Sequence, residues 1–465
     1  MNIKKAMLNS MLFLLILASG SAFPQALDVK KMDALFDTLE SNNRMMGSVT
    51  LAKDGKIIYQ RSLGYRLISD KEKIKIDPQT QFRIGSVTKV FTAVMIHQLI
   101  EEKKLTLNTK LVKFFPQIPN ADKITIAHLL SHTSGLHDYT DGVSYDPADS
   151  KAWIFQPQTS SQMLSRIAEL KSDFVPGIEQ RYSNTNYTLL GYILEAITNS
   201  TYDKQLSKRI NNKIGLKRTH YDGRIDSSNN EAYSYVFDNG KWNQNAEQEL
   251  SIAHGAGGIV STTADMAKFM YALSAYKLIS KKSLTIMSSP FMDKFPDSRL
   301  GIASFKLRGV NKMAISKQGG IDAFASDVVY VPEDRFAFTL VINGSNYPMA
   351  KIFWNVIDIY YHQPATLPSF KVLTLRAESL EAFKGEYALK GAGVSIVIKK
   401  EGASLSGQAT GQEVFLLEAI SENTFTHPAS GIIAEFDKSA DGSIKSFKLH
   451  QGRDTSLWER VSSSQ

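Results

Sequence analysis

The stretch R-I-G-S-V-T-K-V-F, residues 83–91, places a serine three positions before a lysine at the start of an apolar run. Residues three apart on a helix share one face, so Lys89 would lie beside the hydroxyl of Ser86. A serine hydroxyl needs a base to become a nucleophile, and a lysine serves when burial and nearby cations lower its pKa. Backbone N–H groups at a helix start also favour a developing oxyanion. The spacing favours acyl transfer. Helix capping by Ser86 is the competing interpretation, and Ser274–Lys277 repeats the S-x-x-K pattern.

A second candidate stretch is R-Y-S-N-T-N-Y, residues 181–187, which contains the only Y-x-N of the chain. As a phenolate near Lys89, Tyr182 would take the serine proton and later return it to the leaving group. The amide of Asn184 would orient Lys89 or bind a substrate carbonyl. The alternative is structural, with Asn184 capping a helix over 185–198 and Tyr182 packing beside it.

A third stretch, S-K-Q-G-G-I-D-A-F, residues 316–324, follows a short strand-like run. Lys317 would attract a substrate carboxylate and help to lower the pKa of Lys89. The two glycines would let a substrate backbone approach the strand closely. An exposed lysine before a turn is the simpler interpretation of this stretch when it is taken alone.

In this order and at this wide spacing, the three motifs resemble those of the serine β-lactamases and penicillin-binding DD-peptidases, especially the class C branch with its esterase and peptidase relatives. That family carries S-x-x-K, then Y-x-N, then K-T-G or H-x-G. The stretches L-L-S-H-T-S-G-L (129–136) and G-A-G-G-I-V-S-T-T-A-D-M (255–266) also look like the family. The resemblance covers roughly residues 28–360.

The resemblance implies a role for each matching residue. Ser86 would be the acylated nucleophile, Lys89 and Tyr182 the proton-transfer pair, and Asn184 their orienting residue. Lys317 and Gly319 match the third motif, and the backbone N–H groups of Ser86 and Gly320 would form the oxyanion hole. Gln318 departs from the threonine of K-T-G, which makes carboxylate recognition less secure than acylation. No residue matches the deacylating glutamate of class A enzymes.

The elements that position these motifs follow from apolar spacing. It predicts a first helix after residue 28, a hairpin around Asp54-Gly55, and a long buried helix over 87–104. Further helices are expected at 124–131, 160–170, 185–198, 263–274 and 347–360, and strands return in L-G-I-A-S-F-K-L, M-A-I-S-K and F-A-F-T-L-V-I-N. Strands at both ends of a helical middle predict an α+β fold. With the resemblance, this means an antiparallel sheet flanked by helices with an all-helical subdomain.

Prolines interrupt the pattern at residues 362–371, which we interpret as a linker. The preceding residues, 23–361, are the expected hydrolase domain. Beyond the linker, short alternating strands such as V-S-I-V-I-K-K predict an all-β, barrel-like (lipocalin-like) domain over 372–465.

The first 22 residues pair Lys4 and Lys5 with a short apolar run and end in G-S-A, which predicts a cleaved signal peptide and a periplasmic or secreted protein with no membrane anchor afterwards. The chain has 465 residues and no cysteine, so disulfides and thiolate metal sites are excluded. Its formal net charge is +8, and the positive residues are dispersed along the chain, which argues against a nucleic-acid partner.

Several other patterns are given no role in the chemistry. His128, His132 and His137 lack the H-E-x-x-H pattern of a zinc protease, so no metal is predicted there. His254 either lines the cleft or packs in the core. No G-x-S-x-G, G-x-G-x-x-G or Walker A motif is present, so no cofactor is implied.

The sequence therefore predicts an exported serine hydrolase that forms an acyl-enzyme on Ser86. Its expected substrates are D-amino-acid-containing peptides, as for a DD-carboxypeptidase or D-aminopeptidase, with small-molecule or cell-wall peptide substrates as partners. Carboxylesterase and β-lactamase activities are alternatives. A non-catalytic penicillin sensor or cell-wall binding protein is the alternative of a different class.

Overall fold

The computed structural model describes residues 27–221, 223–238, 240–370, 373–389, 391–402, 404–427, 430, 432–439, 441–451 and 454–461. The predicted signal peptide, residues 1–22, lies outside the described residues. Within the described part, no helix is both long enough and apolar enough to cross a membrane.

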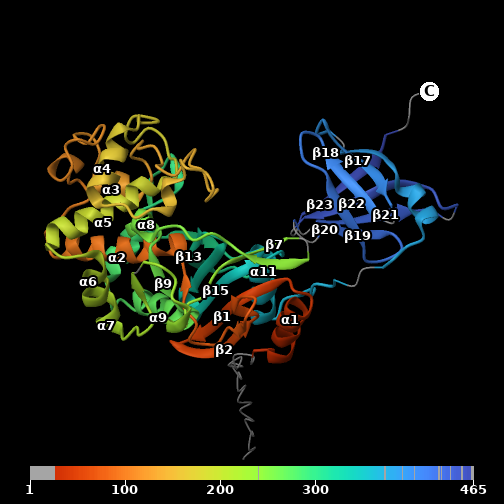
Figure 1. The fold of residues 1–465 in the computed structure, drawn as a ribbon, viewed down its shortest axis with the longest axis horizontal. Coiled ribbons are helices and arrows are strands. Elements are labelled where there is room, and N and C mark those ends of the chain that lie inside the picture. Colours follow the sequence, from red (N-terminus) through yellow and green to blue (C-terminus); the bar gives the residue numbers. More distant parts are fainter. Residues whose placement is uncertain are drawn as a thin grey trace, which may run out of the picture.

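A mainly antiparallel sheet at the centre of the main domain joins the two ends of its sequence (Figure 1). The central pair is β1 (Met45–Lys53) with β15 (Phe336–Ser345), which align from Met45↔Ser345 to Lys53↔Phe336. The predicted hairpin at Asp54-Gly55 is confirmed, since both residues have the positive φ that a two-residue turn of this kind needs. The strands run in the order β12 (Ala303–Lys306), β13 (Met313–Ile321), β14 (Phe324–Val331), β15 (Phe336–Ser345), β1 (Met45–Lys53) and β2 (Lys56–Leu63), and β7 (Tyr235–Asp238) and β8 (Lys241–Gln244) extend the sheet beside β15.

Helices cover both faces of this sheet, as an α+β fold requires. On one face, α1 (Val29–Ser41) and α11 (Met349–Tyr360) bury apolar side chains against β1 and β15. Asp28 starts α1 by accepting the N–H of Lys31 with its side chain. The opposite face packs against α9 (Thr263–Ser274), and α2 (Thr88–Glu101) lies farther into the same hydrophobic core. The predicted fold class is therefore confirmed.

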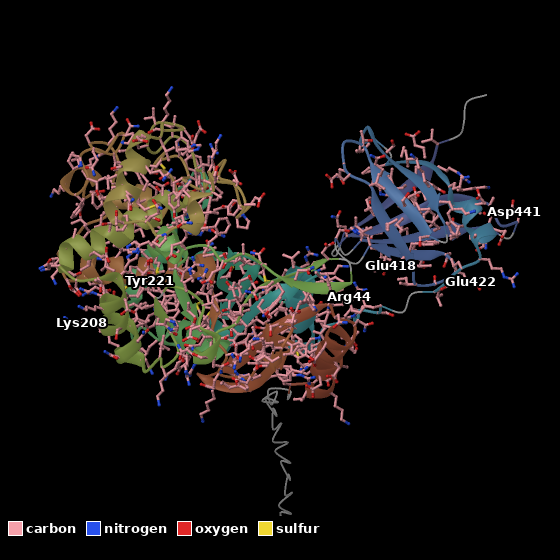
Figure 2. The ribbon with its side chains drawn as sticks, in the orientation of Figure 1. Arg44, Lys208, Tyr221, Glu418, Glu422 and Asp441 are labelled. Carbon is pink, nitrogen blue, oxygen red and sulfur yellow. The ribbon has the colours of Figure 1, made fainter. Side chains whose placement is uncertain are left out.

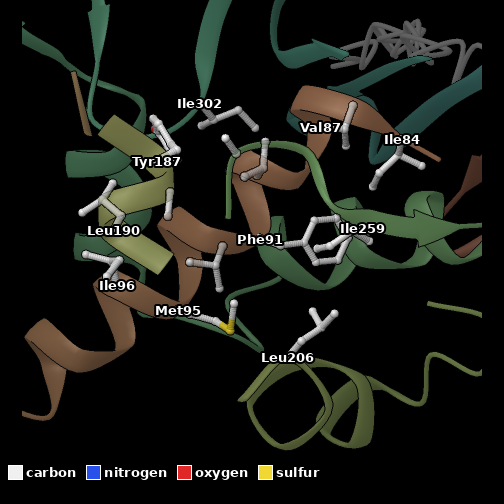
Figure 3. Packing of buried hydrophobic residues seen from close by; sticks show 14 of the residues in the cluster. Ile84, Val87, Phe91, Met95, Ile96, Tyr187, Leu190, Leu206, Ile259 and Ile302 are labelled. Atoms are coloured by element: carbon white, nitrogen blue, oxygen red, sulfur yellow. The ribbon is translucent and has the colours of Figure 1, made fainter. Parts of the chain in front are cut away.

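The long helix α2 runs through the centre of the larger core. Its residues from Thr88 to Leu99 are all buried, which fits a helix that is apolar around most of its circumference. Figure 3 shows Phe91, Met95 and Ile96 projecting from it toward different neighbours. A polar side chain on this helix is therefore held out of water whichever way it points.

The segment between α2 and β10 (Pro290–Met292) supplies a helical lobe beside β13 (Figure 1). Its helices include α3 (Ile126–Leu130), α4 (Ser160–Glu169), α5 (Asn184–Thr198), α6 (Tyr202–Leu206) and α8 (Leu250–Gly257). A small sheet of β5 (Phe82–Arg83), β9 (Ile259–Ser261) and β6 (His220–Tyr221) leads the chain into α2. Helix α10 (Lys281–Ser288) and the pair β10 (Pro290–Met292) and β11 (Phe295–Arg299) then return the chain to β12.

The C-terminal strands form a closed barrel of eight strands, which confirms the predicted barrel-like architecture. Large aromatic side chains fill its interior, among them Phe383, Tyr387, Phe425, Phe436 and Phe447. Eight strands enclose a space that side chains can fill, and this barrel is packed in that way. Its strands are β16 (Gly385–Leu389), β17 (Val394–Glu401), β18 (Ser404–Ala409), β19 (Phe415–Ala419), β20 (Thr424–His427), β21 (Ile432–Lys438), β22 (Ile444–Gln451) and β23 (Asp454–Arg460).

The barrel stands apart from the helical lobe, beyond the edge of the main domain that carries α1 (Figure 1). The two parts approach each other at Arg44 and Glu418, whose charged groups are 4.0 Å apart (Figure 2). This pair is partly exposed, so we ascribe little stability to it. The cleft described below is built from the main domain.

Candidate active site

Ser86 lies in a single 3₁₀ turn, η1 (Gly85–Val87), which leads directly into α2. Gly85 has a φ of 49°, a left-handed conformation that glycine adopts without strain. The turn brings the Ser86 Oγ within 2.7 Å of the Tyr182 Oη and 3.0 Å of the Lys89 Nζ. The sequence predicted Ser86 in the first turn of the helix itself, and the structure places it in the tighter turn that precedes α2.

Lys89 is buried in the core beneath the cleft. Its Nζ lies 3.0 Å from the Ser86 Oγ, 2.8 Å from the Asn184 Oδ1 and 2.8 Å from the Ala256 carbonyl oxygen. Burial lowers the pKa of Lys89 to about 7. When neutral, the amine keeps two N–H donors for Asn184 and Ala256, and its lone pair can accept the Ser86 proton. The geometry therefore suits a general base.

The low pKa of Lys89 predicts a rise in kcat/KM with pH. Below about pH 7 the ammonium has no lone pair, so it cannot accept the Ser86 proton, and above it the amine can. We expect kcat/KM to increase about tenfold per pH unit on the acidic side and to level off above the pKa. Initial rates measured between pH 5 and 9 give this part of the pH profile of kcat/KM. A flat profile across that range would contradict the assignment of Lys89 as the base.

Tyr182 stands on the other side of the Ser86 hydroxyl. Nearly half of the side chain is exposed, but its hydroxyl points inward to the Ser86 Oγ at 2.7 Å. Burial raises the pKa of this phenol, and the Lys317 cation lowers it by less. The neutral phenol is therefore the favoured form, whereas the sequence analysis expected a phenolate. A neutral hydroxyl donates a proton more readily than it accepts one, which suits protonation of a leaving group.

Asn184 holds Lys89 from the first residue of α5. Its Oδ1 accepts from Lys89, while its Nδ2 and backbone N–H donate to the Asp138 Oδ2 at 3.0 Å and 2.8 Å. Asp138 is buried and lies in the loop after α3. Asn184 does not cap α5 through its side chain, and Asp138 accepts the N–H at this helix start instead. Asp138 was not predicted from the sequence, where its position two residues after L-L-S-H-T-S-G-L is the only signal for it.

His132 packs with its ring against the ring of Tyr182. Its ring is stacked on the phenol with centroids 4.5 Å apart, and its Nδ1 accepts the N–H of Ser183 at 3.2 Å. Its carbonyl oxygen also accepts the N–H of Arg181 at 3.0 Å, so the residues on both sides of Tyr182 are fixed. Burial and two nearby lysines lower the pKa of His132 well below its usual value, which keeps the ring neutral.

The other histidines of this stretch have structural partners. His128 completes a capping box with Thr125 at the start of α3, and His137 pairs with Asp173 at 2.8 Å. His254 is buried and stacks on Tyr192 with ring centroids 4.5 Å apart. Of the two alternatives for His254, packing in the core is therefore the observed one.

The third motif lies on β13, which continues through both glycines to Ile321. Lys317 Nζ is 5.4 Å from the centre of the Tyr182 ring and donates to the Gln318 carbonyl oxygen at 3.0 Å. A Cβ atom on Gly319 would lie 2.2 Å from the Ile84 carbonyl oxygen and 2.8 Å from the Ser86 nitrogen. Only glycine permits this approach of β13 to the nucleophile turn.

The same close approach places Gly320 against the nucleophile turn. A Cβ atom on Gly85 would lie 2.7 Å from the Gly320 carbonyl carbon and oxygen and 2.8 Å from its nitrogen. The backbone of Gly320 therefore lies next to the turn that carries Ser86. This proximity is required if the N–H groups of Ser86 and Gly320 are to bind one oxyanion. The predicted residues Ser86, Lys89, Tyr182, Asn184, Lys317, Gly319 and Gly320 all lie around this cleft. Their catalytic roles stay predictions.

A pocket of about 280 Å³ opens beside Ser86, and neither Tyr182 nor Lys317 is among its lining residues. Its walls combine aromatic and aliphatic side chains with a few polar groups. Asp322 is the one carboxylate in this lining, and its two oxygens accept from Arg83 and from the N–H of Gln248. The lining residues are Ser86, Tyr139, Thr140, Tyr145, Asn184, Gln248, Ile252, Ala253, Ala256, Gly257, Gly320, Ile321, Asp322 and Phe324.

Comparison with known proteins gives a family match over most of the main domain. The beta-lactamase family model matches residues 32–359. Penicillin-binding protein 4* of Bacillus subtilis is 27% identical over 443 residues, which cover 91% of this chain and 96% of that protein. Teichoic acid D-alanine hydrolase of Staphylococcus aureus is 27% identical over 316 residues, or 67% of this chain and 74% of that protein.

A solved structure resembles both parts of the chain. The octameric penicillin-binding protein homologue from Pyrococcus abyssi superposes with a TM-score of 0.64 and 21% sequence identity. The match covers 93% of this chain and 100% of that chain. At this level of identity the likeness bears on the fold alone.

Proposed function

Because this chain belongs to the beta-lactamase family of serine hydrolases, we propose that it is an exported enzyme that cleaves an amide or ester bond at the carbonyl group of a D-amino acid. The observation that carries the proposal is the position of the Ser86 Oγ between the Tyr182 Oη at 2.7 Å and the Lys89 Nζ at 3.0 Å. A base and an acid are thus each within hydrogen-bond reach of the nucleophile.

Acylation follows from this arrangement. Neutral Lys89 takes the Ser86 proton as the Oγ adds to the substrate carbonyl, and the N–H groups of Ser86 and Gly320 stabilise the oxyanion. Tyr182 then donates its proton to the leaving nitrogen or oxygen as that bond breaks, and the proton held by the Lys89 ammonium passes to the resulting Tyr182 phenolate, which restores both neutral groups. The products of this half-reaction are the free leaving group and an ester on Ser86. Water attacks that ester by the reverse sequence and releases the acid.

The two sides of Ser86 differ in what they would hold. The leaving group must reach Tyr182, so it lies toward Lys317, whose cation favours a free carboxylate such as that of a C-terminal D-alanine. The acyl part then occupies the pocket of about 280 Å³. Because Asp322, the one carboxylate among the lining residues, is ion-paired with Arg83 and its side chain is 1% exposed, it is not available to an ammonium group in the pocket. An N-acylated residue therefore fits better than a free N-terminus, which favours a carboxypeptidase over an aminopeptidase.

The related proteins support a D-amino-acid substrate. One is a penicillin-binding protein and another a teichoic acid D-alanine hydrolase by name, so both point to cell-wall components. We propose a periplasmic or secreted location, which rests on the signal-like residues 1–22. Cell-wall peptide is accordingly the proposed partner. Gln318 replaces the threonine of K-T-G, so we do not restrict the proposed substrates to penicillins.

A four-substrate panel tests the proposal. The panel contains an N-acylated peptide ending in D-alanyl-D-alanine, a D-alanyl anilide with a free amine, a D-alanyl ester and nitrocefin, with Ser86→Ala as background. We expect the N-acylated peptide to give the highest kcat/KM, by about tenfold or more over the free-amine anilide, because the pocket lacks a partner for the ammonium. Fastest turnover of nitrocefin would instead indicate a β-lactamase. An adduct that persists for hours in intact-mass spectra after penicillin addition, without turnover of any substrate, would indicate a sensor.

A further inference from the structure

A buried ion pair connects the strand before the nucleophile turn with the turn after the third motif. Arg83 ends β5, three residues before Ser86, and its side chain is 1% exposed. Its Nη1 donates to the Asp322 Oδ2 at 2.9 Å, and Asp322 follows β13 two residues after Gly320. The pair spans 239 residues of sequence and joins the two segments that carry the oxyanion-hole N–H groups.

The guanidinium group of Arg83 holds a third segment in the same place. Nη1 also donates to the Gln248 carbonyl oxygen at 2.8 Å, and Nη2 donates to the Gly223 carbonyl oxygen at 3.0 Å and to Glu247. The Gln248 N–H completes a ring by donating to the other oxygen of Asp322 at 2.9 Å. Because Glu247 also pairs with Arg83, this cation keeps one partly buried carboxylate even if Asp322 is neutralised.

The conformation of Asp322 indicates why a fixing interaction is needed here. Its φ is 54°, in the left-handed region, so the turn between β13 and β14 carries backbone strain that glycine would relieve. The side-chain bonds to Arg83 and Gln248 hold this residue in that conformation. Gly319 and Gly320, which Ile321 separates from Asp322, lie against the backbone of Ile84, Gly85 and Ser86 without any intervening side chain.

We propose that the Arg83–Asp322 pair is a positioning element of the oxyanion hole, which fixes the Gly320 N–H relative to the Ser86 N–H. The proposal rests on the proposed function, since it assumes that these two N–H groups bind the oxyanion. Ser326 strengthens the same junction from β14, because its Oγ donates to the Ile84 carbonyl oxygen at 2.7 Å. A shift of β13 relative to η1 would open the hole without moving Ser86, Lys89 or Tyr182.

The test compares Asp322→Asn with Asp54→Asn in the full chain. Asp54 is a matched control, since it also has a φ of 54° in a hairpin turn and pairs with an arginine, Arg335, at 2.9 Å, outside the cleft. We expect Asp322→Asn to lower kcat by about 10- to 100-fold with KM within about twofold, because the oxyanion forms after substrate binds. Asp54→Asn should leave both constants unchanged.

Binding of phenylboronic acid gives the readout that a merely structural role would not move. The Ser86 Oγ adds to the boron as its proton passes to Lys89, and the anionic tetrahedral adduct places one boron hydroxyl where the oxyanion forms. We expect Asp322→Asn to weaken boronate binding by the same factor by which it lowers kcat. The dissociation constant of a non-hydrolysable substrate-like amide, which forms no oxyanion, should be unchanged. If Asp322→Asn fails to fold, Ser326→Ala tests the same junction and should weaken boronate binding by about 3- to 30-fold, as loss of one hydrogen bond predicts.

Three results would overturn the positioning role: unchanged boronate affinity in both junction variants, equal losses in Asp322→Asn and Asp54→Asn, or a loss confined to KM. Failure of the proposed function looks different. In that case the unsubstituted protein itself turns over none of the D-amino-acid substrates, or Ser86→Ala retains the activity.

Discussion

Lys89→Met is expected to lower kcat/KM by about 10³-fold or more, because it removes the base that takes the Ser86 proton. Methionine has a similar length and is apolar, so it fits the buried space that Lys89 occupies. Steady-state rates with the best substrate of the panel, and the rate of Ser86 acylation by a penicillin, measure the loss. A matched control is Lys277→Met in the second S-x-x-K stretch, where the lysine is exposed and packs over Tyr271. Similar losses in both variants would exclude a specific role for Lys89.

The same variant has a second signature in stability. Folding lowers the pKa of Lys89 from its ordinary 10.5 to about 7. Between these values the unfolded chain binds more protons than the folded chain, so the Lys89 contribution makes the unfolding free energy rise with pH. Lys89→Met removes that contribution. The unfolding free energy of the unsubstituted protein should therefore increase relative to that of the variant between pH 7 and pH 9. Urea unfolding at the two pH values measures it, and a pH-independent difference would mean that Lys89 keeps its ordinary pKa.

The fold could be predicted where local pattern decides the structure. The apolar spacing in 87–104 predicted α2, and Asp54-Gly55 predicted the first hairpin. Strand β14 (Phe324–Val331) was not predicted, because it is buried along almost its whole length and carries Ser326 and Asp327 in its middle. Those polar residues are explained only by partners in other segments, Ile84 and Gln318. A strand whose polar groups are satisfied across the fold has no local signature.

In the candidate site, too, contacts between residues close in sequence were predictable and contacts across the fold were not. Ser86 and Lys89 are three residues apart, so their contact follows from helical geometry, and the order of motifs predicted Tyr182 and Asn184. Asp138 was missed because it acts on Asn184 across 46 residues of sequence. The favoured charge state of Tyr182 also could not be inferred, since burial and Lys317 act on it in opposite directions and only the structure gives their balance.

That charge state leads to the second large effect, expected for Tyr182→Phe. A phenol that burial keeps neutral is a proton donor, so its loss should matter most when the leaving group cannot depart unprotonated. We expect kcat/KM to fall by about 10²- to 10³-fold for a D-alanyl amide, but by less than about tenfold for a D-alanyl nitrophenyl ester, whose leaving group needs no proton. Stacking on His132 at 4.5 Å should hold the phenylalanine ring in place.

The comparison of two substrates separates the two roles that Tyr182 could have. If its hydroxyl only relayed the Ser86 proton to Lys89, both substrates would lose the same factor, because both acylate Ser86. The direct 3.0 Å contact between the Lys89 Nζ and the Ser86 Oγ makes such a relay unnecessary. Tyr276→Phe is the control, since it removes a phenol that is exposed to a similar degree, 49% against 45%, but is not part of the candidate site. Equal losses for amide and ester in Tyr182→Phe would therefore reassign Tyr182 to the first proton transfer, whereas a loss confined to the amide places it at the leaving group.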